Sequence, residues 1–435
     1  MDLGLDITAA RVRAAVMDDA TVRWCGEVPV TTSWHRAARD ALRDAERATG
    51  ARVDHVGVAI APGRDDLDFE ELALVRLSAP VASWLAPLSG WPVDLARRLD
   101  DRVRVVAGAA GYLGGEAIAL NDEALEAAAE HLSRRGARHI VVAGAGALAA
   151  PELEREAARR LRVLVAGASV SPSAEAGGAG LRERENAMLL DGALQGWARD
   201  VLSQLTQVCG DRPLVFVRGG GGAVAGDYFA RHPLGSVESR LRAAVDGALA
   251  LSDGDDLIVV FGDEGSTSTI GVSGGAVTSP DLALAWGIRH NHQPVERITR
   301  SEPDMVPLDT ARLARRRPAH DVVVVGDDAH RIEGRRPSLG AFAVAIGATR
   351  AEISVRTDRL VSGDAATRSR RIAELAEETR TRLVRAGAAP DGEVAMDVES
   401  SPVAYVADDA HTVQIVARAV RRAPDSARER EATGE

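Results

Sequence analysis

Two segments far apart in the chain, residues 6–16 and 261–272, each predict a strand-turn-strand hairpin with polar residues at its turn. A hairpin that holds phosphate needs glycines for close backbone approach, hydroxyls for the phosphate oxygens, and a carboxylate for Mg²⁺. The second hairpin has Gly265, Ser266 and Thr267 at its turn, whereas the first has Asp6 but no glycine. From these residues alone, two ordinary β-hairpins are the simpler interpretation.

Metal ligation is a second chemistry that the residue types allow. His290 and His292 are two residues apart, so on a strand both imidazoles would lie on one face. A metal site needs at least a third ligand, which Asp281 or Glu296 could supply. A pair of solvated loop histidines is the alternative interpretation.

Two further polar clusters could bind ligands. Arg218 precedes the glycine run 219–222, which could form an anion nest, although a flexible turn explains the run at least as well. Asp327, Asp328 and His330 follow the predicted strand 321–325, at the position where α/β proteins place ligands. A polar turn is the alternative interpretation of that cluster.

Composition excludes several classes of function. The 435 residues carry 64 acids against 53 bases, a net charge of −11, which argues against nucleic acid or an anionic membrane as the main partner. Every base is arginine, so the chain has no lysine for a Walker A loop or a Schiff base. Cys25 and Cys209 cannot form a disulfide framework; they could pair with each other, but buried free thiols are expected. With no apolar run near ~18 residues and no signal peptide, we expect a cytoplasmic protein.

The candidate residues must be positioned by alternating strands and helices, which indicate an α/β fold. Strands are expected at 3–7, 12–17, 22–30, 53–60, 139–143, 162–166, 213–217, 257–261, 321–325, 394–398 and 412–417. The main helices are expected at 35–48, 182–208, 239–251, 340–347 and 365–386. Residues 289–318 are rich in Arg and Pro and predict a lid, linker or partly ordered loop. The charged tail 421–435 predicts disorder.

From about residue 6 to about residue 420 the chain resembles the hydantoinase A/5-oxoprolinase family, ATP-dependent ring-opening amidohydrolases of the actin-like superfamily. The resemblance rests on the order and spacing of several short stretches rather than on one motif. These stretches are residues 75–80, 90–92, 181–187, 228–233, 345–348, 358–359 and 402–406.

The segments that differ from the family pattern are functional ones, among them the two phosphate hairpins and the Ser-Gly-Pro segment that helps to hold nucleotide. In the first hairpin only Asp6 and Ile7 survive, and Arg13 replaces the last Asp. In the second hairpin one register keeps Asp263, Gly265, Ser266 and Thr267, but Ile270 then replaces the last Asp. The family's Ser-Gly-Pro segment is Ser239-Arg240-Leu241, and its Gln-Asn-Asp/Gly-Gly turn is Arg218-Gly219-Gly220-Gly221.

The resemblance implies an actin-like, two-lobed fold with mixed, ribonuclease-H-type sheets flanked by helices. We expect an N-terminal lobe at 1–172 and a second lobe at 173–420. The implied activity is ATP-dependent hydrolysis of a cyclic amide such as a hydantoin or 5-oxoproline. ATP and Mg²⁺ would then be cofactors, with Asp6 holding Mg²⁺ and with Asp263, Gly265, Ser266 and Thr267 at the phosphates.

The altered motifs predict that this activity is weak or lost. The alternative is a non-catalytic subunit that keeps the scaffold and binds a partner. Because family members often work beside a second subunit, we expect a second hydantoinase-type subunit or a homo-oligomer.

Overall fold

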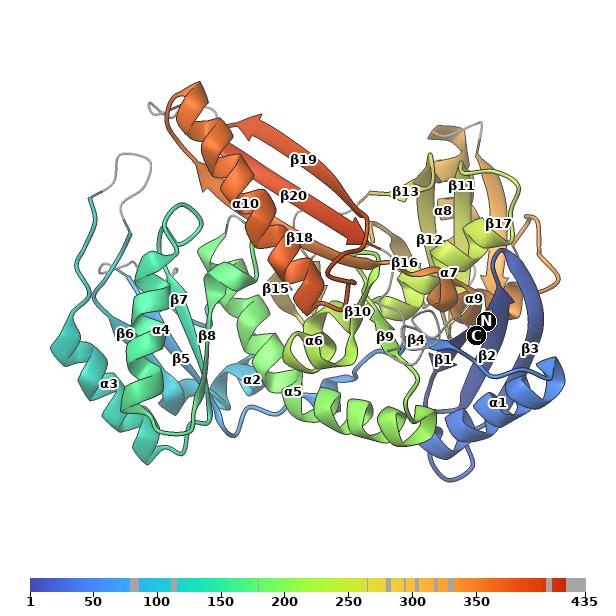
Figure 1. Cartoon of the computed structure of the whole chain (residues 1–435), viewed down its shortest axis with the longest axis horizontal. Coiled ribbons are helices and arrows are strands. Elements are labelled where there is room, and N and C mark those ends of the chain that lie inside the picture. The colour runs from blue at the N-terminus through green and yellow to red at the C-terminus, as the bar shows by residue number, and fades with distance from the viewer. Residues whose placement is uncertain are drawn as a thin grey trace, which may run out of the picture.

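The computed structural model of the protein combines several sheets with flanking helices (Figure 1). It describes residues 1–78, 86–110, 116–178, 180–263, 265–278, 283–292, 295–301, 305–316, 320–327, 332–403 and 409–419. Within these ranges the strands form sheets of nine, five, four and two strands.

The nine-stranded sheet begins with an antiparallel meander of β1 (Asp2–Ile7), β2 (Arg11–Asp18) and β3 (Thr21–Pro29). β4 (His55–Ala59) lies parallel to β1, and β9 (Leu214–Val217) lies parallel to β4. The resulting order β3-β2-β1-β4-β9 is that of a ribonuclease-H-type sheet. β1 and β4 are apolar along most of their length because both faces of the sheet are covered there.

The same sheet continues beyond β9 with strands from the C-terminal half of the chain. β10 (Ala223–Ala225), β18 (Ile353–Val361), β20 (His411–Ala419) and β19 (Val394–Pro402) follow in that order. α10 (Ala365–Arg385) packs on β18 and β20 through a small apolar cluster. N-terminal and C-terminal segments therefore share one sheet.

The five-stranded sheet repeats the hairpin arrangement. β11 (Leu257–Asp263) and β12 (Ser266–Ser273) form an antiparallel hairpin, and β17 (Asp321–Gly326) lies parallel to β11. The short strands β13 (Ala276–Val277) and β16 (Ile298–Arg300) both pair with β12. The two predicted hairpins therefore lie in two separate sheets, β1 and β2 in the nine-stranded sheet and β11 and β12 in the five-stranded sheet.

Two helices lie between these sheets, α7 (Ser239–Ala250) and α9 (Ala343–Arg350). They approach so closely that a Cβ on Gly247 would lie 1.8 Å from the carbonyl oxygen of Ala343. A Cβ on Gly347 would lie 1.9 Å from the carbonyl oxygen of Ala243. Because no side chain fits at either position, both helices depend on glycine to pack in this layer.

The four-stranded sheet is parallel and contains, in spatial order, β6 (Val103–Val106), β5 (Leu72–Leu77), β7 (His139–Gly144) and β8 (Ser169–Pro172). One of its faces packs against α3 and α4, and the other packs against α5. The remaining helices and strands are α1 (Trp34–Thr49), α2 (Val93–Arg97), α3 (Asp122–Arg134), α4 (Glu152–Leu164), α5 (Leu181–Cys209), α6 (Gly226–Arg231), α8 (Val306–Arg316), β14 (Ala283–Ala285) and β15 (Ile288–His290).

The mixed α/β fold class predicted from the sequence is confirmed, but two local predictions are wrong. Residues 162–166 were expected to form a strand, yet α4 continues to Leu164 because Ala157, Ala158 and Leu161 keep one helical face buried. The segment 289–318, expected to be irregular, contains β16 and α8. α8 is held by Val306 and Thr310, which are buried four residues apart, and by an Arg300–Asp309 ion pair of 2.7 Å.

Other sequence expectations have mixed outcomes. Cys25 and Cys209 are free thiols, as predicted, and burial raises the pKa of each to about 11. Within the described ranges, no helix combines the length and the apolar character that a membrane span requires. The expected disordered tail 421–435 lies outside the described residues. The division into lobes at residue 172 stays a prediction.

Candidate functional site

The carboxylates of the two hairpins face the same arginine. Asp6 lies near the end of β1 and Asp263 is the last residue of β11. Arg240 Nε donates to Asp6 Oδ1 at 2.6 Å, its Nη2 donates to Asp6 Oδ2 at 3.4 Å, and its Nη1 donates to Asp263 Oδ2 at 2.5 Å. The guanidinium group of Arg240 therefore joins the nine-stranded sheet to the five-stranded sheet, near the C-terminal ends of β1 and β11.

The start of α7 places Arg240 between the carboxylates. Ser239, the first residue of the helix, is fully buried, and its hydroxyl donates to the carbonyl oxygen of Ile60 at 2.8 Å. Ile60 directly follows β4, so this bond anchors the helix N-terminus beside the first sheet. The next side chain along the helix then reaches both hairpins.

Burial strengthens the electrostatic interactions among Asp6, Arg240 and Asp263. Asp6 is only 3% exposed, and desolvation raises the pKa of its carboxyl group, although Arg240 acts in the opposite direction. Desolvation lowers the pKa of the Arg240 guanidinium, but the two carboxylates outweigh it and leave the pKa raised. Arg240 is therefore charged at every physiological pH and compensates both acids.

A second group of ion pairs lies beside the first. Arg13 on β2 donates from Nη2 to Asp327 Oδ1 at 2.6 Å and from Nε to Glu27 Oε2 at 2.7 Å. Arg11 also pairs with Asp327, which directly follows β17. Asp328 and His330, grouped with Asp327 in the sequence, lie outside the described residues. Asp327 thus joins the two sheets through arginines rather than lining an open ligand site.

The polar residues of the second hairpin serve its own turn and sheet. Gly265 has a φ of +81°, which the tight turn requires and which glycine adopts without strain. Ser266 Oγ donates to the carbonyl oxygen of Asp263 at 3.0 Å, inside the same turn. Thr267 is 5% exposed in β12. The structure brings Asp6 and Asp263 together, but it gives Ser266 a partner within its own turn.

These residues do not fit Mg²⁺ and a nucleotide as they stand. A magnesium site needs carboxylate oxygens that are free to face the ion. Here both carboxylates already accept hydrogen bonds from Arg240, whose own charge would repel a second cation at the same oxygens. In the arrangement described here, Arg240 holds the two sheets together.

The two histidines predicted as metal ligands lie near each other. Their ring centroids are 6.5 Å apart, and His290 Nδ1 accepts the backbone N–H of His292 at 3.2 Å. Desolvation lowers the pKa of His290 to about 4 and lowers that of His292 well below 6.5, so both rings are neutral. They are buried or half-buried, so the alternative of two solvated loop histidines is wrong.

No third ligand completes this pair in the part of the chain that the structure describes. Among those residues, no group of three or more His, Cys, Asp or Glu side chains is arranged to hold a metal. Asp281, one of the two expected additional ligands, lies outside the described ranges. The metal site at His290 and His292 stays a prediction.

Arg240 is the site residue that sequence reasoning missed. The resemblance placed it at a family glycine, and we interpreted it only as a lost motif. One feature of the sequence could have identified it: a large cationic residue stands where the resembled family has glycine, while Asp6 and Asp263 are kept. Arg13, at the family's last Asp of the first hairpin, carried the same signal.

Comparisons with known proteins support the fold. No protein-family profile and no curated protein matches the chain. Two solved structures are similar to it at 12% sequence identity, an ATP-dependent caprolactamase from Pseudomonas jessenii with a TM-score of 0.76 and a nucleotide-free acetone carboxylase with a TM-score of 0.68. Each alignment covers 98% of this chain and 88% of the other chain. The chain therefore has the actin-like, mixed α/β fold of these two proteins.

Proposed function

We propose that this protein is a non-hydrolysing relative of the ATP-dependent cyclic-amide hydrolases, in which an arginine replaces the metal-bound nucleotide between the two hairpins. The observation that supports this proposal is the position of Arg240, bonded to both Asp6 and Asp263. The protein then acts as a scaffold subunit beside a second hydantoinase-type subunit or in a homo-oligomer.

Charge explains why the replacement is stable. Asp6 and Asp263 lie at the ends of strands from two different sheets, and two carboxylates held close together repel each other unless a cation lies between them. In an ATP-dependent enzyme that cation is Mg²⁺, which binds together with the phosphates of the nucleotide and is present only while nucleotide is bound. Arg240 supplies it permanently from the protein itself, so the two sheets are joined without a ligand.

A second candidate is the ATP-dependent hydrolysis of a cyclic amide, such as a hydantoin, 5-oxoproline or a lactam. It is favoured by the similarity, over 98% of the chain, to two proteins described as ATP-dependent. In this candidate Arg240 must leave the hairpins before Asp6 can hold Mg²⁺. Gly265, Ser266 and Thr267 would then contact the phosphates.

Calorimetric titration with Mg·ATP and with a non-hydrolysable analogue separates the two candidates. For the non-hydrolysing protein we expect no binding heat at millimolar nucleotide and no stimulated phosphate release. Micromolar binding together with turnover of about 1 s⁻¹ or faster would contradict the proposal and support the hydrolase.

Two variants show whether Arg240 is the cause. Arg240→Gly restores the residue type of the resembled family, and we expect it to gain nucleotide affinity if the rest of the junction is intact. Arg242→Gly is the matched control, because Arg242 lies on the same helix and, among the described residues, forms its ion pair with Asp246, four residues later. Nucleotide binding by the wild type that is equal to binding by Arg240→Gly would show that Arg240 does not block the site.

A further inference from the structure

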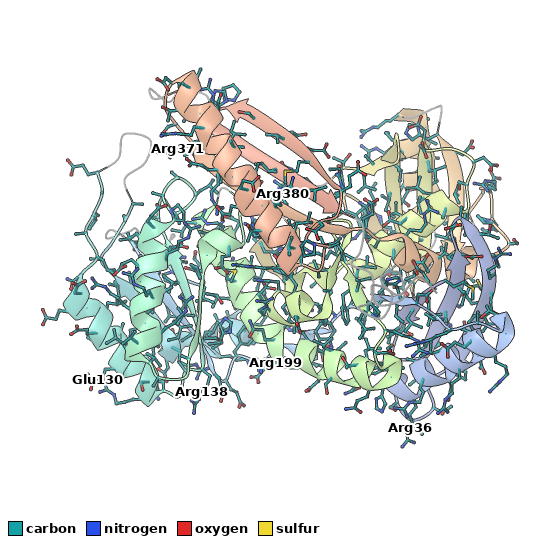
Figure 2. All side chains as sticks on the ribbon, in the orientation of Figure 1. Arg36, Glu130, Arg138, Arg199, Arg371 and Arg380 are labelled. Atoms are coloured by element: carbon teal, nitrogen blue, oxygen red, sulfur yellow. The ribbon has the colours of Figure 1, made fainter. Side chains whose placement is uncertain are left out.

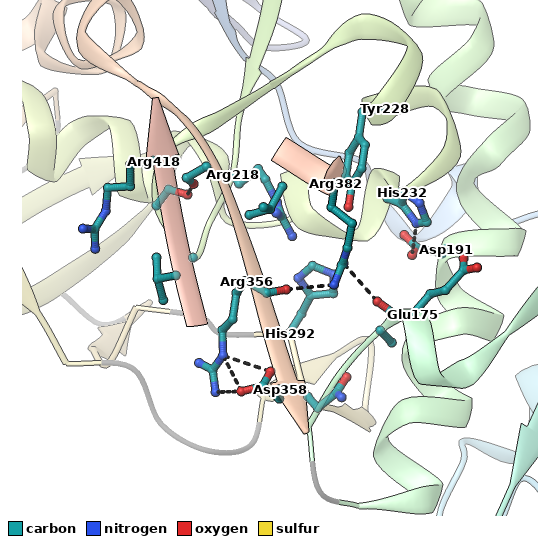
Figure 3. Close-up of a pocket in the computed structure, with 17 residues that line it drawn as sticks. Glu175, Asp191, Arg218, Tyr228, His232, His292, Arg356, Asp358, Arg382 and Arg418 are labelled. Carbon is teal, nitrogen blue, oxygen red and sulfur yellow. Dashed lines mark hydrogen bonds and ion pairs between the residues drawn. The ribbon is translucent and has the colours of Figure 1, made fainter. Parts of the chain in front are cut away.

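A basic cavity lies apart from the Arg240 junction, where the nine-stranded sheet meets α6 and α10 (Figure 3). It has a volume of about 190 Å³, and only Ala176, Val355 and Val416 contribute apolar side chains to its lining. Its basic lining comprises Arg218, Arg356, Arg382, Arg418, His232 and His292, its acidic lining comprises Glu175, Asp191 and Asp358, and Tyr228 adds a phenol. A neighbouring cavity of about 580 Å³ shares Glu175, Tyr228, His232 and Arg382 with it.

Several charges in this cavity are already paired. Arg356 donates from Nε to Asp358 Oδ1 at 2.8 Å, and Arg418 on the rim pairs with Asp397 at 2.6 Å. His232 Nδ1 lies 3.4 Å from Asp191 Oδ2. In each of these pairs the negative charge of the carboxylate offsets the charge of its basic partner.

Among the described residues, two other guanidinium groups, those of Arg218 and Arg382, form no ion pair with a carboxylate, although the Glu175 carboxylate lies near Arg382. Within the described ranges, the side chain of Arg218 makes no hydrogen bond and no ion pair. Arg382 donates to the carbonyl oxygens of Arg356 and Glu175 and to the hydroxyl of Thr357, at 3.0–3.2 Å, and these acceptors are all uncharged. In addition, Nη1 of Arg356 is buried without a partner. Four arginines line the cavity against three acids, Glu175, Asp191 and Asp358, and the Arg218 guanidinium has N–H donors that bond to no described residue.

Figure 3 shows Arg218, Arg382 and Tyr228 converging on the same space. Two guanidinium groups held beside each other in a partly buried cavity repel unless an anion lies between them. Guanidinium forks match the oxygens of carboxylate and phosphate groups. We propose that this cavity binds a small oxyanion, a carboxylate or a phosphate, between Arg218 and Arg382.

The ionisation of Tyr228 agrees with this positive field. Burial alone would raise the pKa of its phenol, but Arg382, His232 and Arg218 outweigh that effect and lower the pKa to about 8. At neutral pH the phenol is mainly protonated, so it can donate a hydrogen bond to an anion. A bound anion would in turn raise the pKa of Tyr228, because it adds negative charge nearby.

The glycine run beside Arg218 has a packing role. Gly222 has a φ of +67°, and a Cβ there would lie 2.1 Å from Ser354 Oγ on β18. The run therefore lets the turn approach the sheet that forms one wall of the cavity. Gly220 and Gly221 also line the cavity, so the anion nest considered from the sequence stays a prediction.

The proposal is tested by titrating the full chain with inorganic phosphate and, separately, with succinate at constant ionic strength. We expect at least one anion to bind, and its affinity to fall roughly ten-fold or more in Arg218→Met and Arg382→Met, because each loses a charge-assisted contact. Arg36→Met is the control, because Arg36 is exposed on α1 at the outside of the molecule (Figure 2). Binding of phosphate alone or of succinate alone identifies which oxyanion the site takes.

A second readout uses the wild-type protein, so it does not depend on folding of the variants. Saturating anion should raise the pKa of Tyr228, followed by ultraviolet difference absorbance and assigned with Tyr228→Phe. Arg218→Lys, which keeps the charge, should bind more tightly than Arg218→Met. Absence of binding by both anions, equal affinity in Arg218→Met and wild type, or an unchanged tyrosine titration would each overturn the proposal.

Discussion

Replacing Arg240 with methionine should destabilise the protein by removing the cation between Asp6 and Asp263. Methionine keeps most of the side-chain volume but cannot donate the three hydrogen bonds of 2.5–3.4 Å to the two carboxylates. Breaking a buried ion pair from one side costs about 3–5 kcal/mol. Because the side chains of Arg240 and Asp263 remain 14% and 25% exposed, we expect about 3 kcal/mol, at the low end of that range.

The loss should depend on pH in a direction that the burial of Asp6 determines. Its pKa is already raised above 3.8 by desolvation, and Arg240 is the main influence that lowers it. Without Arg240 the folded-state pKa rises further, so the folded variant holds a proton that the unfolded chain releases. The stability contributed by that proton is complete below about pH 3.8 and is lost as pH rises through the folded-state pKa. The variant should therefore lose stability relative to wild type as pH increases.

Urea unfolding followed by circular dichroism at about pH 5 and pH 8 measures both effects. Arg242→Met is the matched control, because its ion pair with Asp246 stays within α7. The double variant Asp6→Asn/Arg240→Met should recover roughly 1 kcal/mol or more, because it no longer buries an uncompensated carboxylate. A loss for Arg240→Met no larger than that of the control, at both pH values, would refute the view that Arg240 joins the two sheets.

Three further predictions concern other parts of the molecule. Spectroscopic titration should find one tyrosine with a pKa of about 8, and Arg382→Met should raise this pKa by removing the main cation beside Tyr228; no change would contradict that assignment. Gly247→Ala should lower the midpoint of thermal unfolding, because overpacking costs about 1–3 kcal/mol, whereas an unchanged midpoint would mean that α7 and α9 can separate at no cost. Cys25 and Cys209, with pKa values of about 11, should react slowly with a thiol reagent at neutral pH, and rapid modification would show exposed thiolates.

Local elements were largely predictable from the sequence because their contacts are local. The apolar pattern of residues 3–7 and 12–17 predicts the first hairpin, and β1 and β2 pair across that turn. The prediction of secondary structure failed where tertiary contacts determine whether a segment is ordered. α8 contains Pro and several Arg residues, and it is held by burial of Val306 and by a bond between Asp309 and the earlier strand β16.

The sequence by itself determined the fold class, the two hairpins, and the departure of the nucleotide motifs from the resembled family. Residue types and short-range spacing carry that information. Only the tertiary structure decided which group lies between Asp6 and Asp263, because Arg240 lies 234 residues from Asp6 in the chain. The same is true of Arg218, which forms no ion pair with any residue that the structure describes, because its environment depends on which side chains surround it. An arginine side chain can face solvent, form an ion pair or bind a ligand. Which of these it does depends on neighbouring side chains, and these come from distant segments of the chain.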